Sequence, residues 1–129
     1  MDDRHDLRRL TDALLRFRRE RDWEQFHNPK DQMLSLSLEA AELLELAQWK
    51  NGQELDEHLV VRRRELGDEL ADVLGWVLLI AHDQQIDLAD AFEAKLAANA
   101  QKYPVDASRG RAEKWTAYAN AKASAKGDA

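Results

Sequence analysis

Residues 38–46 read LEAAELLEL, a stretch that combines leucines with glutamates. Leu43 lies four residues after Glu39, and Leu38 and Leu46 lie four residues on either side of Glu42, spacings that predict one face of an α-helix. Three glutamates lie among the leucines, and the stretch contains no lysine or arginine. Glu39 and Glu42 are three residues apart, so they share a helix face beside leucines that we expect to be buried. The pattern places carboxylates at the edge of a core.

A second acidic stretch, RELGDELADVLGW at residues 64–76, repeats this arrangement with Glu69 and Asp72. A single acidic pair on an amphipathic helix usually faces water. Two pairs on consecutive long helices change the interpretation, because antiparallel neighbours would bring four carboxylates together. Two such charges about 4 Å apart repel by about 4 kcal/mol at an effective dielectric of about 20. Divalent cations would remove this repulsion, which predicts a metal site.

The donor set of this predicted site consists of carboxylate oxygens. Neither acidic stretch contains a histidine, whereas di-iron helix bundles place imidazole ligands beside their carboxylates. Hard oxygen ligands favour Mg²⁺, with Mn²⁺ as a possible substitute. Mg²⁺ held by a few carboxylates usually serves a phosphate substrate.

The composition predicts an all-α protein. The chain has 129 residues, with five glycines and two prolines, which suits a single helical domain. We expect a four-helix bundle over residues 1–119, followed by a flexible tail at 120–129. The run VLGWVLLIA at 73–81 is apolar on every side, which predicts burial in an oligomer or at a bundle centre. The expected helices cover residues 7–21, 29–50, 64–82 and 88–102, with 53–61 left open between a short helix and an approach segment, and a short helix at 111–119.

Charge and composition also limit location and partners. The absence of cysteine and of an apolar leader segment favours the cytoplasm, and the longest apolar run is too short to span a bilayer. A net charge of −6 argues against nucleic-acid binding. Two basic clusters are interpreted as solvated helix faces. They consist of Arg18, Arg19 and Arg21, and of Arg62, Arg63 and Arg64.

The spacing Glu39-x-x-Glu42 followed by Glu69-x-x-Asp72 resembles the signature of the all-α MazG-like nucleoside triphosphate pyrophosphohydrolases. Further segments resemble the dCTP pyrophosphatase branch of that family, and the resemblance extends from about residue 7 to residue 118. These segments are RDWEQFHNP at 21–29, ELLELAQWK at 42–50, GDELADVL at 67–74 and NAQKYP at 99–104.

The resemblance implies a homotetramer, or a dimer, that removes unwanted nucleotides from the cellular pool. It would use Mg²⁺ to cleave dCTP or a modified dCTP between the α and β phosphates, giving the monophosphate and pyrophosphate. The implied metal ligands are Glu39, Glu42, Glu69 and Asp72, with Glu39 or Glu42 also accepting a proton. The implied base-binding residues are Trp23, His27 and Trp49. The implied phosphate-binding residues are Lys95, Asn99, Lys102 and Tyr103.

Two departures from the family pattern leave the base preference open. Leu14 stands where relatives place a histidine, and Trp76 stands where they place a tyrosine. Another nucleotide, such as dUTP, therefore remains an alternative substrate. A different class of function is a non-catalytic helical module whose acidic stripe docks a basic partner. That alternative predicts that Mg²⁺ leaves thermal stability unchanged.

Overall fold

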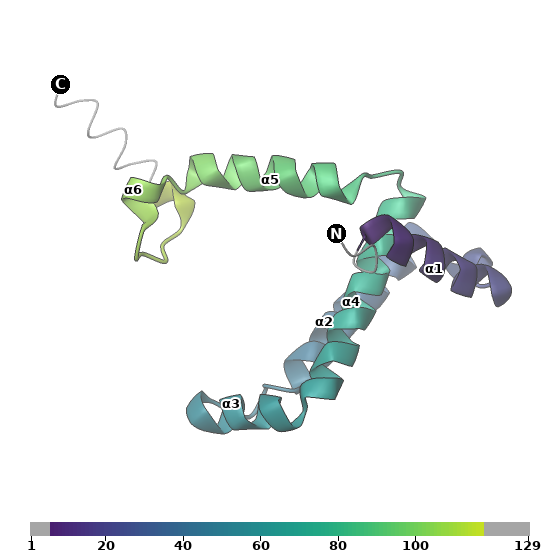
Figure 1. Cartoon of the computed structure of the whole chain (residues 1–129), viewed down its shortest axis with the longest axis horizontal. Coiled ribbons are helices and arrows are strands. Elements are labelled where there is room, and N and C mark those ends of the chain that lie inside the picture. Colours follow the sequence, from purple (N-terminus) through teal and green to yellow (C-terminus); the bar gives the residue numbers. More distant parts are fainter. Residues whose placement is uncertain (1–5, 118–129) are drawn as a thin grey trace. The chain divides into compact units, whose positions relative to one another are not determined.

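The computed structural model describes residues 6–117, and all of their regular structure is helical (Figure 1). The all-α prediction is therefore confirmed for this part of the chain. The chain divides after Asp87 into two units. The first contains α1 (Leu7–Glu20), a 3₁₀ helix (Glu24–Phe26), α2 (Pro29–Glu45), α3 (Gly52–Val61) and α4 (Arg63–Asp83). The second contains α5 (Leu88–Lys102) and α6 (Val105–Ser108).

Two helix starts carry side-chain caps. The Asp6 carboxylate accepts a hydrogen bond from the Arg8 amide at 2.8 Å, which begins α1. The Asn28 side chain accepts one from the Asp31 amide at 2.9 Å, and Pro29 follows at the first helical position, where its missing N–H costs nothing. The predicted start of the second helix at residue 29 is confirmed.

The predicted end of that helix at residue 50 is wrong, because α2 ends at Glu45. Beyond it the chain tightens into turns in which the Ala47 amide donates to the Leu44 carbonyl and the Lys50 amide donates to the Ala47 carbonyl. These bonds span three residues, as in a 3₁₀ helix, and they replace the four-residue α pattern. The segment at 53–61, left open by the sequence, is helical and forms most of α3.

The first unit is built around α2 and α4. The two helices pack side by side, and α4 runs back along α2 after the turn through α3 (Figure 1). Helix α1 also packs against α4, and α3 contacts the same helix. Leu78, Leu79 and Ala81 of α4 are buried, whereas Leu74 is exposed. The apolar run at 73–81 is thus only partly covered within one chain.

The predicted short helix at 111–119 is wrong over residues 111–114, which are not helical, and is confirmed over residues 115–117, which are helical. The structure also forms α6 directly after Pro104, with the Ser108 amide donating to the Pro104 carbonyl at 2.9 Å. Gly110 follows with a φ of 74°, a left-handed conformation that ends this helix. Residues 118 and 119, the predicted domain boundary and the tail at 120–129 lie outside the described residues. Among residues 6–117, the structure has no helix that combines the length and the hydrophobicity of a membrane span.

Candidate active site

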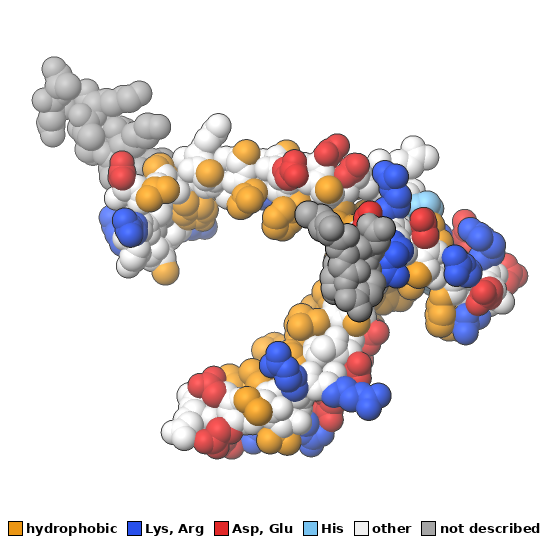
Figure 2. All heavy atoms as spheres, viewed as in Figure 1, with side chains coloured by type: hydrophobic (Ala, Val, Ile, Leu, Met, Phe, Trp, Pro, Cys, Tyr) orange, Lys and Arg blue, Asp and Glu red, His pale blue; other side chains and the backbone are white. Residues whose placement is uncertain are grey.

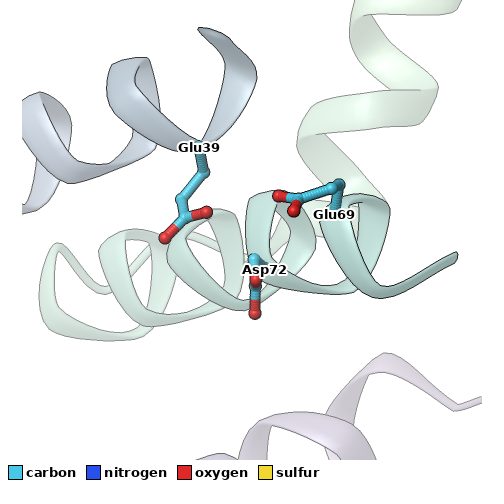
Figure 3. A group of neighbouring side chains, drawn as sticks. All are labelled: Glu39, Glu69 and Asp72. Carbon is cyan, nitrogen blue, oxygen red and sulfur yellow. The ribbon is translucent and has the colours of Figure 1, made fainter. Parts of the chain in front are cut away.

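Packing of α2 against α4 brings three predicted metal ligands together. Glu39 extends from α2 toward Glu69 of α4, and Asp72 lies one turn further along α4 (Figure 3). One carboxylate oxygen from each residue lies within 4.8 Å of the others. The expectation that antiparallel helices would unite the acidic pairs is met for these three carboxylates.

The fourth predicted ligand, Glu42, is exposed at the edge of this cluster. It lies outside the set of three but interacts with two of its members. Burial raises the pKa of Glu39, and a hydrogen bond with Glu42 raises it further. Burial is also the main cause that raises the pKa of Glu69, followed by the negative charges of Glu42 and Asp72. All four carboxylates therefore belong to one electrostatic group.

Two oxygens of this group lack hydrogen-bond donors. Oε2 of Glu39 and Oε2 of Glu69 are buried and have no hydrogen-bond partner among residues 6–117. A buried carboxylate oxygen without a donor is costly, because it has lost water and gained nothing in return. An all-oxygen set with unpaired buried atoms fits a hard divalent cation such as Mg²⁺ or Mn²⁺. Glu24 and His27 also have a Glu-x-x-His spacing, but no candidate ligand group among the described residues includes them.

A cavity of about 380 Å³ adjoins the carboxylates and shares Glu39 and Asp72 with them. Its wall is largely apolar and aromatic, which suits a planar ring more than a chain of charged groups. Helices α1 and α4 and the two residues that flank the 3₁₀ helix supply most of it. The lining residues are Leu14, Phe17, Arg18, Trp23, His27, Glu39, Ala71, Asp72, Gly75, Trp76 and Leu79.

Two of the three predicted base-binding residues line this cavity. Trp23 packs edge-on against Phe17, with ring centroids 5.7 Å apart, and His27 packs edge-on against Trp76 at 5.2 Å. The third, Trp49, does not line it. Trp49 lies in the turns after α2 with 85% of its surface exposed. Within one chain the structure does not bring Trp49 to the cavity.

The positions that depart from the family pattern also lie in the cavity wall. Leu14 and Trp76 both line it, although neither was predicted to be a site residue. Gly75, which precedes Trp76 in the chain, lies close to Leu14, because a Cβ added there would be 3.8 Å from Cδ2 of Leu14. The only feature of the sequence that drew attention to Leu14 and Trp76 was that relatives have other residue types at these two positions.

Arg18 is a lining residue that the sequence interpretation missed. The prediction of a solvated basic cluster is wrong for Arg18, which is 3% exposed, and holds for Arg19 and Arg21, which are exposed. The Arg18 guanidinium donates two hydrogen bonds to the Asp83 carboxylate, at 2.8 and 2.9 Å. This ion pair lowers the pKa of Asp83 below its ordinary value. Asp83 lies 65 residues from Arg18 in the sequence, so no local sequence pattern predicts this ion pair.

A sequence model of the MazG-like family matches residues 34–117. The chain belongs to the MazG-like family. It is 42% identical over 113 residues to dCTP pyrophosphatase 1 of Mus musculus and 39% identical to the protein of the same name from Homo sapiens. Each match covers 86% of this chain and 65% of the relative, so the chain spans just under two thirds of these relatives' length.

A solved structure supports the same assignment. A pyrophosphatase from Archaeoglobus fulgidus superposes with a TM-score of 0.73 at 36% sequence identity. The superposition covers 81% of this chain and 97% of that protein. The predicted MazG-like fold is therefore confirmed, and the carboxylate cluster lies within the residues that the family model matches.

The predicted phosphate-binding residues of this MazG-like chain lie in the second unit. Lys95 and Asn99 lie four residues apart on α5, and the Tyr103 amide donates to the Asn99 carbonyl at 2.8 Å. The Lys102 ammonium lies 5.5 Å from the centre of the Trp115 ring. Lys95 and Lys102 are exposed and Asn99 is half-buried. Their role at the phosphates stays a prediction.

Proposed function

We propose that this chain is a Mg²⁺-dependent nucleotide pyrophosphohydrolase that converts dCTP, or a modified dCTP, into the monophosphate and pyrophosphate. The observation that carries the proposal is a carboxylate cluster that opens into an aromatic cavity. The cluster suits metal-bound phosphates, and the cavity suits a base attached to them. Relatives named dCTP pyrophosphatase 1 support the choice of cytosine. The protein would act in the cytoplasm as a nucleotide-pool cleaner.

Different residues of the chain would bind the metal, accept a proton and bind the phosphates. Glu39, Glu42, Glu69 and Asp72 would hold Mg²⁺, and bound Mg²⁺ would offset the charge of the triphosphate and lower the pKa of a coordinated water. Water would attack the α-phosphorus in line with the bond to the leaving pyrophosphate. Glu39 or Glu42 would accept the proton of that water, because their carboxylates adjoin at the cluster. The phosphate-binding roles of the α5 residues belong to the same proposal.

The cavity would hold the base while the phosphates react. Trp23 and Trp76 offer aromatic surface at the wall, and stacking on aromatic side chains contributes about 1–3 kcal/mol per base but discriminates poorly between bases. Selectivity must therefore come from hydrogen bonds. Leu14 lies at the wall and offers none, which keeps dUTP as a second candidate substrate.

The proposal predicts a defined pair of products. Full-length protein is incubated with dCTP and Mg²⁺ in ¹⁸O-labelled water, and the products are identified by mass spectrometry. Attack at the α-phosphorus gives labelled dCMP and unlabelled pyrophosphate. Glu39→Ala should lose this activity, whereas Asp68→Asn, which changes an exposed acid of α4 outside the cluster, should retain it.

Other products would contradict specific parts of the proposal. Formation of dCDP and phosphate would mean that the β–γ bond is cleaved. Cleavage of dUTP in preference to dCTP would overturn the base assignment alone. No hydrolysis of any nucleotide in a broad panel would leave the interaction-module alternative as the better account.

We also propose that the chain forms a homotetramer, with a dimer as the smaller alternative. Hydrophobic side chains lie exposed along the α2–α4 pair and along α5 (Figure 2). Exposed apolar surface on this scale is typical of an interface. The exposed hydrophobic side chains include Leu34, Leu38, Leu44, Leu70, Leu74, Phe92 and Leu96. Trp49 would reach a base pocket only through such an assembly.

Sedimentation equilibrium should give about four times the chain mass of 14.8 kDa, and a monomeric mass would refute the assembly.

A further inference from the structure

Three helices hold one partly buried polar network beside the cavity. Asp83 of α4 receives the guanidinium of Arg18 from α1, and its Oδ2 also accepts a hydrogen bond from Nε2 of Gln32 of α2 at 2.7 Å. Gln32 is 1% exposed and Arg18 is 3% exposed. Two parallel N–H···O bonds fix a guanidinium in orientation as well as in position. Arg18 is therefore held rigidly at the cavity wall.

The same guanidinium faces the imidazole of His27. Nη1 of Arg18 lies 3.4 Å from Nδ1 of His27. Arginine has hydrogen-bond donors and no acceptor, so the contact is favourable only when Nδ1 carries a lone pair. A proton on Nδ1 would point one donor at another. The geometry therefore disfavours both the Nδ1-protonated tautomer and the imidazolium.

The surrounding charges also keep the imidazole neutral. Burial lowers the pKa of His27, and the positive charge of Arg18 lowers it further, against smaller opposing effects of Asp83 and Glu24. A neutral ring with a lone pair on Nδ1 must carry its proton on Nε2. Trp76 packs edge-on against the ring and limits its rotation. His27 thus has one defined N–H donor.

We propose that the Arg18–Asp83–Gln32 network holds His27 in the Nε2-protonated tautomer, so that His27 acts as a fixed donor in the cavity and favours cytosine over uracil. This inference rests on the proposed function. Cytosine presents an acceptor at N3, whereas uracil presents an N–H there. A donor that cannot change its tautomer pairs with the first and opposes the second. Arg18 acts through His27 and is a positioning residue.

The tautomer can be observed directly by NMR. Full-length protein is labelled with ¹⁵N-histidine, and the His27 signals are assigned by their loss in His27→Gln. The wild-type protein at neutral pH should show a protonated Nε2 and an unprotonated Nδ1. A proton on Nδ1 would overturn the proposal, and this result requires no variant of Arg18.

Matched variants separate positioning from stability. In Arg18→Gln combined with Asp83→Asn, the glutamine oxygen can accept a hydrogen bond from Nδ1, and no carboxylate is left without its cation. This double variant should populate both tautomers. Arg18→Lys keeps a side chain that only donates, so it should retain the wild-type tautomer. An unchanged tautomer in the double variant, or a changed one in Arg18→Lys, would contradict the role of Arg18.

Substrate selectivity supplies the second readout. The ratio of kcat/KM for dCTP to that for dUTP should fall roughly tenfold in the double variant, as expected for one hydrogen bond, and should stay near wild type in Arg18→Lys. A shifted tautomer with an unchanged ratio would overturn the selectivity claim. Absence of hydrolysis in the wild type would refute the proposed function instead, and the NMR result would still stand by itself.

Discussion

Replacing Glu39 with glutamine should reduce hydrolysis at least about a hundredfold, while raising the melting temperature of the metal-free protein by on the order of a few degrees. The two effects have opposite signs for one reason. Glu39 is crowded by Glu42, Glu69 and Asp72, whose charges all raise its pKa. A neutral amide removes repulsion from the empty cluster, but it also removes a ligand and a negative charge that Mg²⁺ requires. Activity assays and thermal melts in EDTA measure the two effects.

A Mg²⁺ titration extends this comparison. Ligand binding to the folded state stabilises it by RT ln(1 + [L]/Kd), about 2.7 kcal/mol at a hundred times Kd. The melting temperature of the wild type should therefore rise with Mg²⁺, and that of Glu39→Gln should rise much less. Asp68→Asn should behave as wild type, since Asp68 is an exposed acid of α4 outside the cluster. A metal-free Glu39→Gln protein that melts below the wild type would show that the cluster carries no net repulsion.

The second large effect is on stability. Arg18→Ala should lower the free energy of unfolding by about 3–5 kcal/mol, because Asp83 is then left partly buried without its cation. The pair is well enclosed, with side-chain exposures of 4% for Arg18 and 22% for Asp83. Replacing both partners, as in Arg18→Met with Asp83→Leu, should recover much of the loss. Urea unfolding at a fixed protein concentration provides the measurement.

The adjacent Arg19 is the matched control. It is exposed, so Arg19→Ala should change stability by no more than about 0.5 kcal/mol. An equal loss in both variants would mean that the Arg18–Asp83 pair has no special weight.

The contribution of the pair should also depend on pH. The pKa of Asp83 is lowered from 3.8, chiefly by its hydrogen bonds from Arg18. The unfolded chain then binds a proton at Asp83 more readily than the folded chain does, so acidification favours unfolding. The stabilisation is fully present above the ordinary pKa and is lost as the pH falls through the folded pKa. The difference in the free energy of unfolding between the wild type and the Arg18→Gln, Asp83→Asn double variant should narrow below about pH 4. A difference that stays constant to lower pH would argue against this linkage.

The carboxylate cluster shows how much of the site the sequence could predict. The spacing of Glu39 and Glu42, and of Glu69 and Asp72, placed each pair on one helix face, because α-helical geometry brings residues three apart to the same side. The cap at Asn28 and Pro29 likewise followed from local chemistry. These inferences needed only a few neighbouring residues, and the structure confirms the three-carboxylate cluster and the helix start.

The aromatic residues show where prediction from the sequence weakened. Trp23 and Trp49 received the same role through the resemblance, yet only Trp23 lines the cavity of this chain. The difference lies in the end of α2, which tightens into turns and leaves Trp49 exposed. Leu14 and Trp76 line the cavity because α1 packs against α4, and that contact joins residues far apart in the chain.

Arg18 and Arg19 show the difference between what local sequence predicts and what tertiary packing determines. They are adjacent and chemically identical, and the sequence assigned both to one solvated cluster. A helix turns by about 100° per residue, so one of the two faces the core and the other faces water. Local sequence patterns were enough to place the long helices, apart from the end of α2, together with the spacing of their acids and the family signature, because these depend on neighbouring residues. Only the tertiary structure decided that Arg18 pairs with Asp83, because that choice depends on which helix faces meet across 65 residues of chain.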